Sequence, residues 1–301
     1  MIKIPNCEIF AKIEPINKGW VVDNEKKYYV ETTDGRRLLL RITDASEYEN
    51  IKTQFVMLAK LAGLDISMSC PVDLGFCDDD ISVYQLLTWV DGEDIESALP
   101  KMCTSEQYEW GLKAGRLLKE IHSVPAPKDI RGWSVHFNSM LQGELDSYYS
   151  KAELHCELGE IIIKHLNENN GVLGVRTQTF IHGDYNPGNL IMMPNGEIGA
   201  IDFSSGYGDP FWDIFKVSWR PHLFPHFYSG QIWGYFNNEP ALDFWKIYSY
   251  YFAFGALIAL QAPHWAGFYN LEEGKAVAQN ILTWSYNFNT LIPSWYLDNH
   301  K

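Results

Sequence analysis

Two short apolar runs, at 190–193 and 197–201, stand on either side of a turn sequence that contains Asn195 and Gly196. An Asn-Gly pair between apolar runs is the strongest short-range signal for a β-hairpin, because both residues tolerate positive φ. The pattern therefore predicts two antiparallel strands joined by a two-residue loop. In that register position 190 pairs with position 201, and the residues just outside the two strands face each other.

The predicted register places Asn189 directly opposite Asp202. Opposed residues in an antiparallel pair have Cα atoms about 4.5–5.5 Å apart, and amide and carboxylate oxygens are ligands that suit Mg²⁺. Asp184 precedes Asn189 by five residues, which is the spacing of a catalytic Asp and a metal-binding Asn in one class of phosphoryl-transfer enzymes. These side chains predict a phosphoryl-transfer site. The alternative is that they only cap a turn and end a strand.

A second hairpin is predicted near the N-terminus. The stretches 27–32 and 37–42 flank an Asp-Gly pair at 34–35, which favours a tight turn. A helical pattern begins at Asp44, and an apolar strand is expected at 83–87. Together these segments predict a small lobe built on an antiparallel sheet.

Helical patterns dominate the rest of the chain. Thr104 and Gln107 fit a capping box at the start of one helix. Apolar residues then recur at helical spacing and are expected in the core: Trp110, Ala114, Leu117 and Ile121. Another helix is expected to end near 169–171, and a last one to start at Asn270.

The apolar run at 247–260 is shorter than the roughly 20 residues that cross a membrane, so it predicts a buried helix. The fold class is therefore expected to be α+β with two lobes. Residues 1–90 would form the small N-terminal nucleotide-binding lobe with its antiparallel sheet. Residues 91–301 would form a large, mostly helical lobe that carries catalysis and substrate binding.

Composition narrows the partners. The 301 residues are 46% hydrophobic and carry a formal net charge of −14, which disfavours nucleic acid and anionic membranes and favours a cationic small molecule. Seven acidic side chains flank the strand at 83–87 without an intervening Lys or Arg, and a solvated surface is the alternative reading of this segment. They are Asp78, Asp79, Asp80, Asp91, Glu93, Asp94 and Glu96. An odd number of cysteines, five, and the absence of a signal-like start predict a cytoplasmic protein.

Three segments together resemble the aminoglycoside phosphotransferase family, whose members share the two-lobed fold of protein kinases. The segments are His182-Gly183-Asp184 with Asn189, Ile201-Asp202-Phe203, and Gly208-Asp209-Pro210-Phe211-Trp212-Asp213. The resemblance implies that Asp184 is the catalytic base, that Asn189 and Asp202 bind Mg²⁺, and that His182 holds the loop. The phosphoryl donor would be ATP or GTP. Asp209 and Asp213 are candidate acids that support the site, with capping of a helix start as the alternative.

The N-terminal part departs from the family pattern at two positions. Arg41 stands where the family carries a phosphate-binding lysine, and Gln54 stands where its partner glutamate is expected. The Gln54 amide is therefore expected to orient the Arg41 guanidinium, with Glu47 as an alternative. The resemblance also implies that the Thr88 carbonyl and the Val90 amide bind the purine edge.

A nucleotide-binding loop is expected around Lys18, although one glycine there is a weak signal. Tryptophans are frequent after the Asp202 motif and predict either packing or an aromatic wall for a quaternary ammonium. They are Trp212, Trp219, Trp233, Trp245 and Trp265.

The sequence thus predicts a Mg²⁺-dependent kinase that transfers the γ-phosphoryl group of ATP or GTP to a hydroxyl of an antibiotic, with an aminoglycoside as the first candidate. One alternative is a metabolic kinase for choline, homoserine or a sugar. The other is a nucleotide-binding protein that transfers phosphate poorly, because the carboxylate expected at position 54 is replaced by Gln54.

Overall fold

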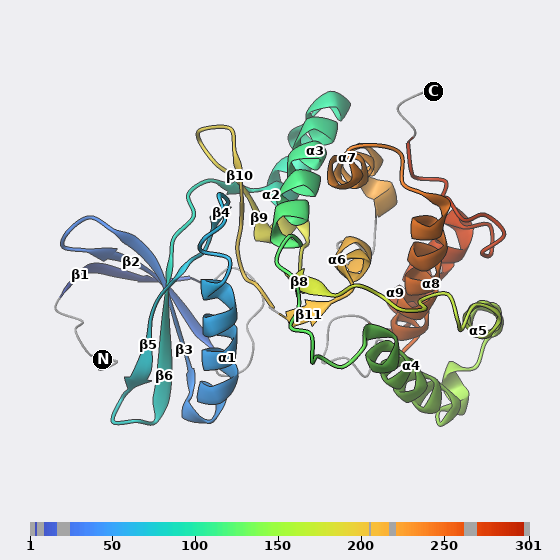
Figure 1. Cartoon of the computed structure of the whole chain (residues 1–301), viewed down its shortest axis with the longest axis horizontal. Helices are drawn as coiled ribbons and strands as arrows, with labels where there is room; N and C mark the ends of the chain where they lie inside the picture. The colour runs from blue at the N-terminus through green and yellow to red at the C-terminus, as the bar shows by residue number, and fades with distance from the viewer. Residues whose placement is uncertain are drawn as a thin grey trace. The chain divides into compact units, whose positions relative to one another are not determined.

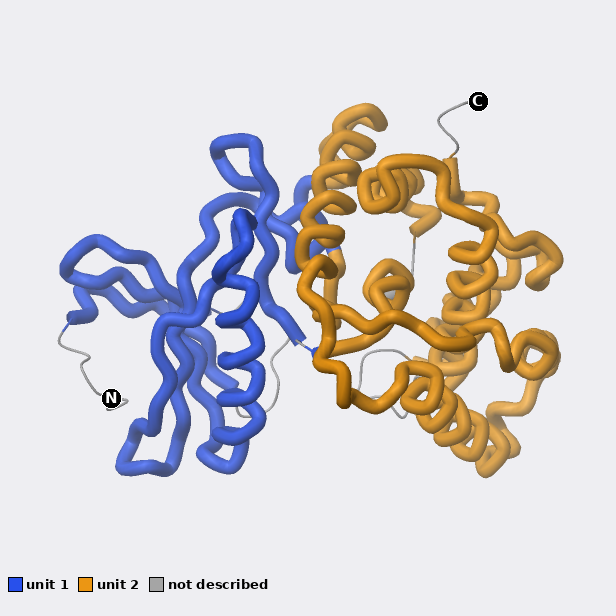
Figure 2. The backbone as a smooth tube through the Cα atoms, viewed as in Figure 1, with its two compact units in different colours: residues 1–98, 187–206 blue, residues 99–186, 207–301 orange. Residues whose placement is uncertain are grey.

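The computed structural model describes residues 4, 9–16, 25–204, 206–216, 221–261 and 270–297. The chain divides into two compact units (Figure 2). Unit 1 comprises Met1–Ala98 together with Pro187–Gly206, and unit 2 comprises Leu99–Asn186 together with Tyr207–Lys301. The sequence-based division at residue 90 differs from these units, because the segment after residue 90 and the 187–206 hairpin pair with each other and pack in unit 1.

Unit 1 is built on a five-stranded antiparallel sheet with the strand order β1-β2-β3-β6-β5 (Figure 1). Its strands are β1 (Phe10–Pro15), β2 (Lys26–Thr32), β3 (Arg37–Asp44), β5 (Pro71–Cys77) and β6 (Ser82–Thr88). The predicted hairpin between β2 and β3 is present, and Gly35 takes φ +84° in its turn. Alternation along the strands divides the sheet into two faces. Val30, Leu38 and Leu40 belong to the core on one face.

Helix α1 (Tyr48–Ala59) packs against β5 and follows a short 3₁₀ turn, Ala45–Glu47. Asp44 caps this turn, since its carboxylate accepts the Ser46 N–H at 2.9 Å. A helix therefore starts close to the predicted position. Leu58 lies on the face of the sheet that carries Arg41 and Leu87, opposite the Val30 core.

A smaller four-stranded sheet in unit 1 holds the hairpin 190–200, with the order β4-β10-β9-β7. Its strands are β4 (Ser67–Met68), β7 (Glu93–Asp94), β9 (Leu190–Met192) and β10 (Ile198–Ala200). Helix α2 (Ile95–Ala98) follows β7 and packs against the 3₁₀ turn Pro187–Asn189. The hairpin strands β9 and β10 are thus joined, through β4 and β7, to the N-terminal part of the chain.

The predicted register of this hairpin is wrong by one residue. Leu190 pairs with Ala200, and the Asn189 carbonyl accepts the Ile201 N–H at 3.0 Å, so Asn189 lies opposite Ile201. The loop has three residues because Pro194, whose fixed φ suits the first central position of a type I turn, takes part in it. Gly196 then closes the turn at φ +80° and donates to the Met193 carbonyl.

Replacing Gly196 by Ala is expected to lower the free energy of unfolding by about 1–2 kcal/mol, because a Cβ is strained at positive φ. No atom lies within 4 Å of the added Cβ, so steric contact would not contribute. Gly143→Ala is the matched control. Gly143 also faces open space, but it lies inside a helix, where Ala is favoured by about 1 kcal/mol. Denaturant unfolding should therefore shift in opposite directions for the two variants.

Unit 2 is mostly helical, with β8 (Thr179–Ile181) paired to β11 (Gly206–Gly208). Its helices are α3 (Thr104–Ile121), α4 (Trp133–Tyr149), α5 (Glu157–Glu168), α6 (Pro210–Lys216), α7 (Pro225–Phe236), α8 (Leu242–Ala259) and α9 (Leu271–Trp284). The capping box of α3 is formed by Cys103 and Glu106, one residue before the predicted pair Thr104 and Gln107. Asn270 caps α9 as expected, by accepting the Glu273 N–H at 2.9 Å.

Helix α8 lies within unit 2 and contacts α4, α5, α6 and α9 (Figure 1). Almost all of its residues are buried, which explains the apolar run at 247–260. Trp212 and Trp245 are buried with exposed fractions of 9% and 1%, so these two tryptophans are packing residues. Trp219 and Trp265 lie outside the described residues. In the described part of the chain, no helix combines the length and apolarity needed to cross a membrane.

Candidate functional site

The buried carboxylate of Asp213 anchors the loop that carries Asp184. β8 ends at Ile181, and the next two backbone amides, of His182 and Gly183, donate to Asp213 at 2.6 and 2.9 Å. Gly183 has φ +83°, a conformation that favours glycine. Asp213 itself is fully buried in α6. The loop geometry therefore depends on a residue about thirty positions further along the chain.

Asp213 also receives a hydrogen bond from His122, the residue that follows α3, whose Nε2 lies 3.1 Å from its carboxylate. The other ring nitrogen of His122 lies 3.0 Å from the Tyr235 hydroxyl. Burial alone would raise the pKa of Asp213, but His122 and the amide of Gly183 lower it below its usual range. Asp213 therefore stays charged at neutral pH and orders the loop.

Asp184 is fixed through its backbone on both sides. Its N–H donates to Nδ1 of His182 at 3.2 Å, and its carbonyl accepts the Asn186 N–H at 2.9 Å. His182 is fully buried. Because its Nδ1 accepts this hydrogen bond, that nitrogen carries no proton. The histidine thus contributes a hydrogen bond that fixes the backbone of Asp184.

Asp209 forms a second buried anchor in unit 2. Arg176 donates to both of its carboxylate oxygens, at 2.6 and 2.9 Å, and the Tyr251 hydroxyl donates at 2.6 Å. The Phe211 N–H donates to it at 3.0 Å, so Asp209 also caps the start of α6. This helix carries Asp213. Asp209 therefore orients the helix that in turn orders the Asp184 loop.

In unit 1, Asn189 and Asp202 flank the β9–β10 hairpin. Asn189 ends the 3₁₀ turn before β9, and Asp202 follows Ile201, the residue opposite Asn189. Asp202 has φ +56°, which is uncommon for a residue with a side chain. The two residues are neighbours across the hairpin ends, although they are not directly opposed as the sequence predicted.

Asp202 forms ion pairs with two cations of the large sheet. Arg41 donates to Oδ1 at 2.9 Å, and Nζ of Lys27 lies 3.3 Å from Oδ2. Burial would raise the pKa of Asp202, but Arg41 and Lys27 outweigh it and lower the pKa. Burial would likewise lower the pKa of Arg41, but Asp202 and Glu25 raise it. Asp202 and Arg41 therefore both carry charge at neutral pH, and Arg41 also donates to Glu25 at 2.6 Å.

The expected hydrogen bond between Gln54 and Arg41 is not formed among the described residues. Arg41 instead donates to the carboxylates of Glu25 and Asp202, which are stronger acceptors than a neutral amide. Gln54 and Arg41 still line one small cavity of about 10 Å³. Its other lining residues are Leu58, Ser69, Gln85, Leu87, Asp202 and Phe203. Glu47, the alternative partner, instead accepts from Asn50 at 3.2 Å.

The segment expected to bind the purine begins at Thr88, the last residue of β6. The Thr88 carbonyl already accepts a hydrogen bond from the Ser69 hydroxyl at 2.8 Å, and its second lone pair leaves room for another donor. The Val90 amide donates to no acceptor among the described residues. Lys18, the candidate of the expected nucleotide loop, lies outside the described residues. The Thr88 carbonyl and the Val90 amide can thus each take part in a further hydrogen bond.

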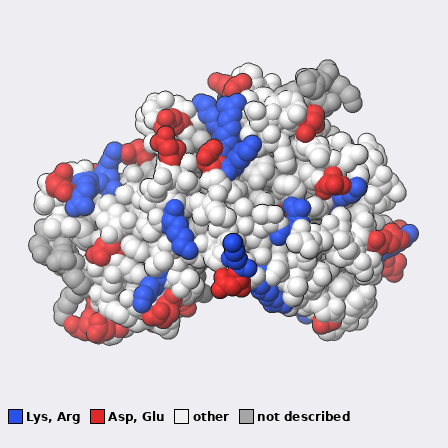
Figure 3. All heavy atoms as spheres, viewed as in Figure 1, with Lys and Arg blue, Asp and Glu red and all other residues white. Residues whose placement is uncertain are grey.

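The seven acidic residues of 78–96 do not form one patch. Asp78, Asp79 and Asp80 occupy the turn before β6, whereas Asp91 lies beyond its other end and pairs with Arg37. Asp94 caps α2 by accepting the Ser97 N–H at 2.8 Å. Figure 3 shows acidic and basic side chains scattered over the face in view. The solvated-surface reading holds for this segment.

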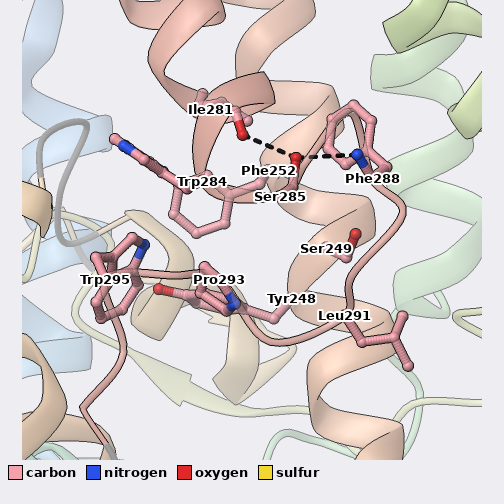
Figure 4. A pocket seen from close by; sticks show the side chains of 10 residues that line it. All are labelled: Tyr248, Ser249, Phe252, Ile281, Trp284, Ser285, Phe288, Leu291, Pro293 and Trp295. Atoms are coloured by element: carbon pink, nitrogen blue, oxygen red, sulfur yellow. Dashed lines mark hydrogen bonds between the residues drawn. The ribbon is translucent and has the colours of Figure 1, made fainter.

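A second cavity lies within unit 2, where aromatic side chains of α8, α9 and the chain after α9 surround it (Figure 4). Its volume is about 20 Å³, and a water molecule needs about 10–15 Å³ by the same kind of measure. Tyr248, Phe252 and Trp284 are among its lining residues. The cavity has space for about one water and is too small for a sugar or an amine substrate.

Four residues that support these networks were missed by sequence reasoning: Glu25, Lys27, His122 and Arg176. Lys27 had only a partial signal: the β2–β3 hairpin was predicted, but a two-residue loop at 34–35 would pair position 27 with position 42, whereas the structure pairs Lys27 with Arg41. The partners of His122 and Arg176 lie 91 and 33 positions away in the sequence. No local pattern indicates such pairs.

A family model described as a phosphotransferase enzyme family matches residues 12–248. The chain therefore belongs to this family of phosphotransferases, and the resemblance to aminoglycoside phosphotransferases is confirmed at the level of the family. A search of curated protein sequences gives no significant match.

Solved structures confirm the α+β, protein-kinase-like fold. A choline/ethanolamine kinase family protein from Mesorhizobium loti is 14% identical, with a TM-score of 0.67 and coverage of 96% of this chain and 94% of its own. The ADP-bound aminoglycoside phosphotransferase APH(2'')-Ib is 16% identical, with a TM-score of 0.60 and coverage of 97% of each chain. An amicoumacin kinase in complex with AMP-PNP, Ca²⁺ and Ami is 16% identical, with a TM-score of 0.57 and coverage of 96% and 91%.

Proposed function

We propose that this protein is a small-molecule kinase that transfers the γ-phosphoryl group of ATP or GTP to a hydroxyl group of its acceptor. The observation that carries the proposal is the loop around Asp184. Its backbone is fixed by His182 and Asp213, and it precedes Asn189 by five residues in a chain of the phosphotransferase family. Phosphoryl transfer depends mainly on such positioning.

In this proposal Asp184 accepts the proton of the acceptor hydroxyl. Asn189 and Asp202 hold Mg²⁺, which neutralises charge on the phosphoryl group when it is bound. The donor set fits this ion, because both side chains offer oxygen ligands. Among the described residues, no group of three or more His, Cys, Asp or Glu side chains could hold a metal alone. Mg²⁺ commonly takes one or two protein carboxylates together with phosphate oxygens and water.

Arg41 binds the phosphates of the donor, and the Thr88 carbonyl and Val90 amide bind its purine. Gln54 lines the cavity beside Arg41 and contributes to this region without orienting the guanidinium. Glu25 supplies the carboxylate that position 54 lacks. Because Arg41 has this carboxylate partner, phosphoryl transfer is favoured over the alternative that the protein binds nucleotide but transfers phosphate poorly.

We propose an aminoglycoside as the acceptor, a polycation that suits the net charge of −14. A metabolic acceptor such as choline, homoserine or a sugar is the second candidate, because one similar fold is that of a choline/ethanolamine kinase family protein.

The four described cysteines, Cys70, Cys77, Cys103 and Cys156, are free thiols, which supports a reducing compartment such as the cytoplasm.

The test is nucleoside diphosphate release with Mg²⁺, with ATP and GTP in parallel. The acceptors are aminoglycosides, macrolides, choline, homoserine and simple sugars. Release that one acceptor class stimulates identifies both donor and acceptor. If wild-type protein binds nucleotide but no acceptor of any class raises release above the no-acceptor rate, the kinase proposal fails in favour of a nucleotide-binding protein.

A further inference from the structure

Four charged side chains meet on the face of the unit 1 sheet that carries Arg41. Glu25 contacts both cations, Arg41 at 2.6 Å and Lys27 at 3.5 Å, and Asp202 contacts the same two at 2.9 and 3.3 Å. The exposed fractions of the Glu25, Lys27 and Arg41 side chains are 12%, 20% and 23%. Two positive and two negative charges thus balance in a partly buried cluster.

The sheet itself brings the two cations together. Lys27 of β2 and Arg41 of β3 are directly paired in the antiparallel register, so their side chains leave the same face. Neighbouring like charges repel unless anions lie between them. Here the bridging anions are Glu25 and Asp202, and one of these, Asp202, is assigned to Mg²⁺ in the proposed function.

The two cations are held with different tightness. Arg41 makes short hydrogen bonds to both carboxylates, whereas the Lys27 contacts of 3.3 and 3.5 Å exceed the roughly 2.7–2.9 Å of a charge-assisted hydrogen bond. An ammonium group has three donors on a flexible stem. Lys27 can therefore turn toward a phosphate oxygen without giving up a strong bond.

We propose that Lys27 is a second phosphate-binding cation of the nucleotide site, and that the nucleotide phosphates exchange with Asp202 as the anions between Lys27 and Arg41. On binding of the magnesium nucleotide, Asp202 leaves the two cations for the metal, and Lys27 and Arg41 take phosphate oxygens in its place. Glu25 stays with Arg41 and keeps its guanidinium oriented. The inference rests on the proposed function, since it assigns phosphates and Mg²⁺ to this face.

Calorimetric binding of ATP and GTP, and of adenosine and guanosine, tests the role of Lys27. Lys27→Gln is expected to weaken triphosphate binding about tenfold or more, the size of a lost charged hydrogen bond, and to leave nucleoside binding unchanged. Lys26→Gln is the matched control, because Lys26 is the exposed neighbour on the other face of β2. Triphosphate affinity equal to wild type in Lys27→Gln, or an equal loss of nucleoside affinity, would overturn the inference.

Asp202→Asn tests the exchange. The carboxylate competes with phosphates for the two cations, so its removal is expected to tighten triphosphate binding without Mg²⁺ roughly tenfold. With Mg²⁺ the same variant is expected to bind more weakly than wild type. A merely structural ion pair would give no gain without metal, and that result contradicts the exchange. Wild-type protein that binds no triphosphate at all would instead contradict the proposed function.

Discussion

Replacing Asp184 by Asn is expected to lower the turnover number by about 10²–10⁴-fold, the usual contribution of a general base. The amide keeps the size of the side chain but cannot accept the proton of the acceptor hydroxyl. The hydrogen bonds that fix the loop use the backbone of Asp184, so the loop is expected to keep its shape. Nucleotide affinity should therefore stay within about twofold, well below the tenfold of a lost charged contact.

The measurement is steady-state turnover together with nucleotide affinity for wild type and Asp184→Asn. Asp243→Asn is the matched control, since Asp243 is exposed and, within the described part of the chain, pairs only with Lys246 of its own helix. Its turnover should equal that of wild type. A turnover number for Asp184→Asn within a few-fold of the control would remove Asp184 from the role of base.

Replacing Arg176 by Met is expected to lower the free energy of unfolding by about 3–5 kcal/mol, because it leaves a buried charge without its partner. Asp209 is fully buried, and Arg176 is the cation that donates to both of its oxygens. The guanidinium also lies 4.5 Å from the ring centre of Phe211. The variant thus loses a paired charge and a cation–π contact together.

Denaturant unfolding of Arg176→Met checks this expectation. Lys246→Met serves as the control, because it removes an ion pair of similar length whose side chains are 50% and 85% exposed. Such a surface pair contributes about 1 kcal/mol or less. Equal stability of the two variants would mean that the Arg176–Asp209 pair does not anchor α6.

Turn chemistry made much of the local fold predictable. The Asp-Gly pair at 34–35 led to the β2–β3 hairpin, and Asn270 led to the start of α9, because both signals act within a few residues. The Asn-Gly pair at 195–196 predicted the second hairpin but gave the wrong register. Pro194 extends the loop by one residue, so the pair alone does not set its length.

The candidate site was predictable where its residues stand close in sequence, as Asp184 and Asn189 do. The groups that hold them are distant. Asp202 and Lys27 lie 175 positions apart, and their contact depends on the pairing of β2 with β3. The partner of Arg41 was expected on the helix, as the Gln54 amide or the Glu47 carboxylate, whereas Glu25 just before β2 supplies it. When a different segment supplies the partner of a site residue, no local sequence pattern indicates it.

The most direct test of phosphoryl transfer follows the phosphoryl group itself. Wild type and Asp184→Asn are incubated with Mg²⁺, γ-labelled ATP or GTP and each acceptor, and the products are analysed by mass spectrometry. The account predicts that one acceptor class gains a single labelled phosphoryl group with wild type, and that Asp184→Asn produces far less of this product. Label that appears only in inorganic phosphate, at equal rates for both proteins, would contradict it.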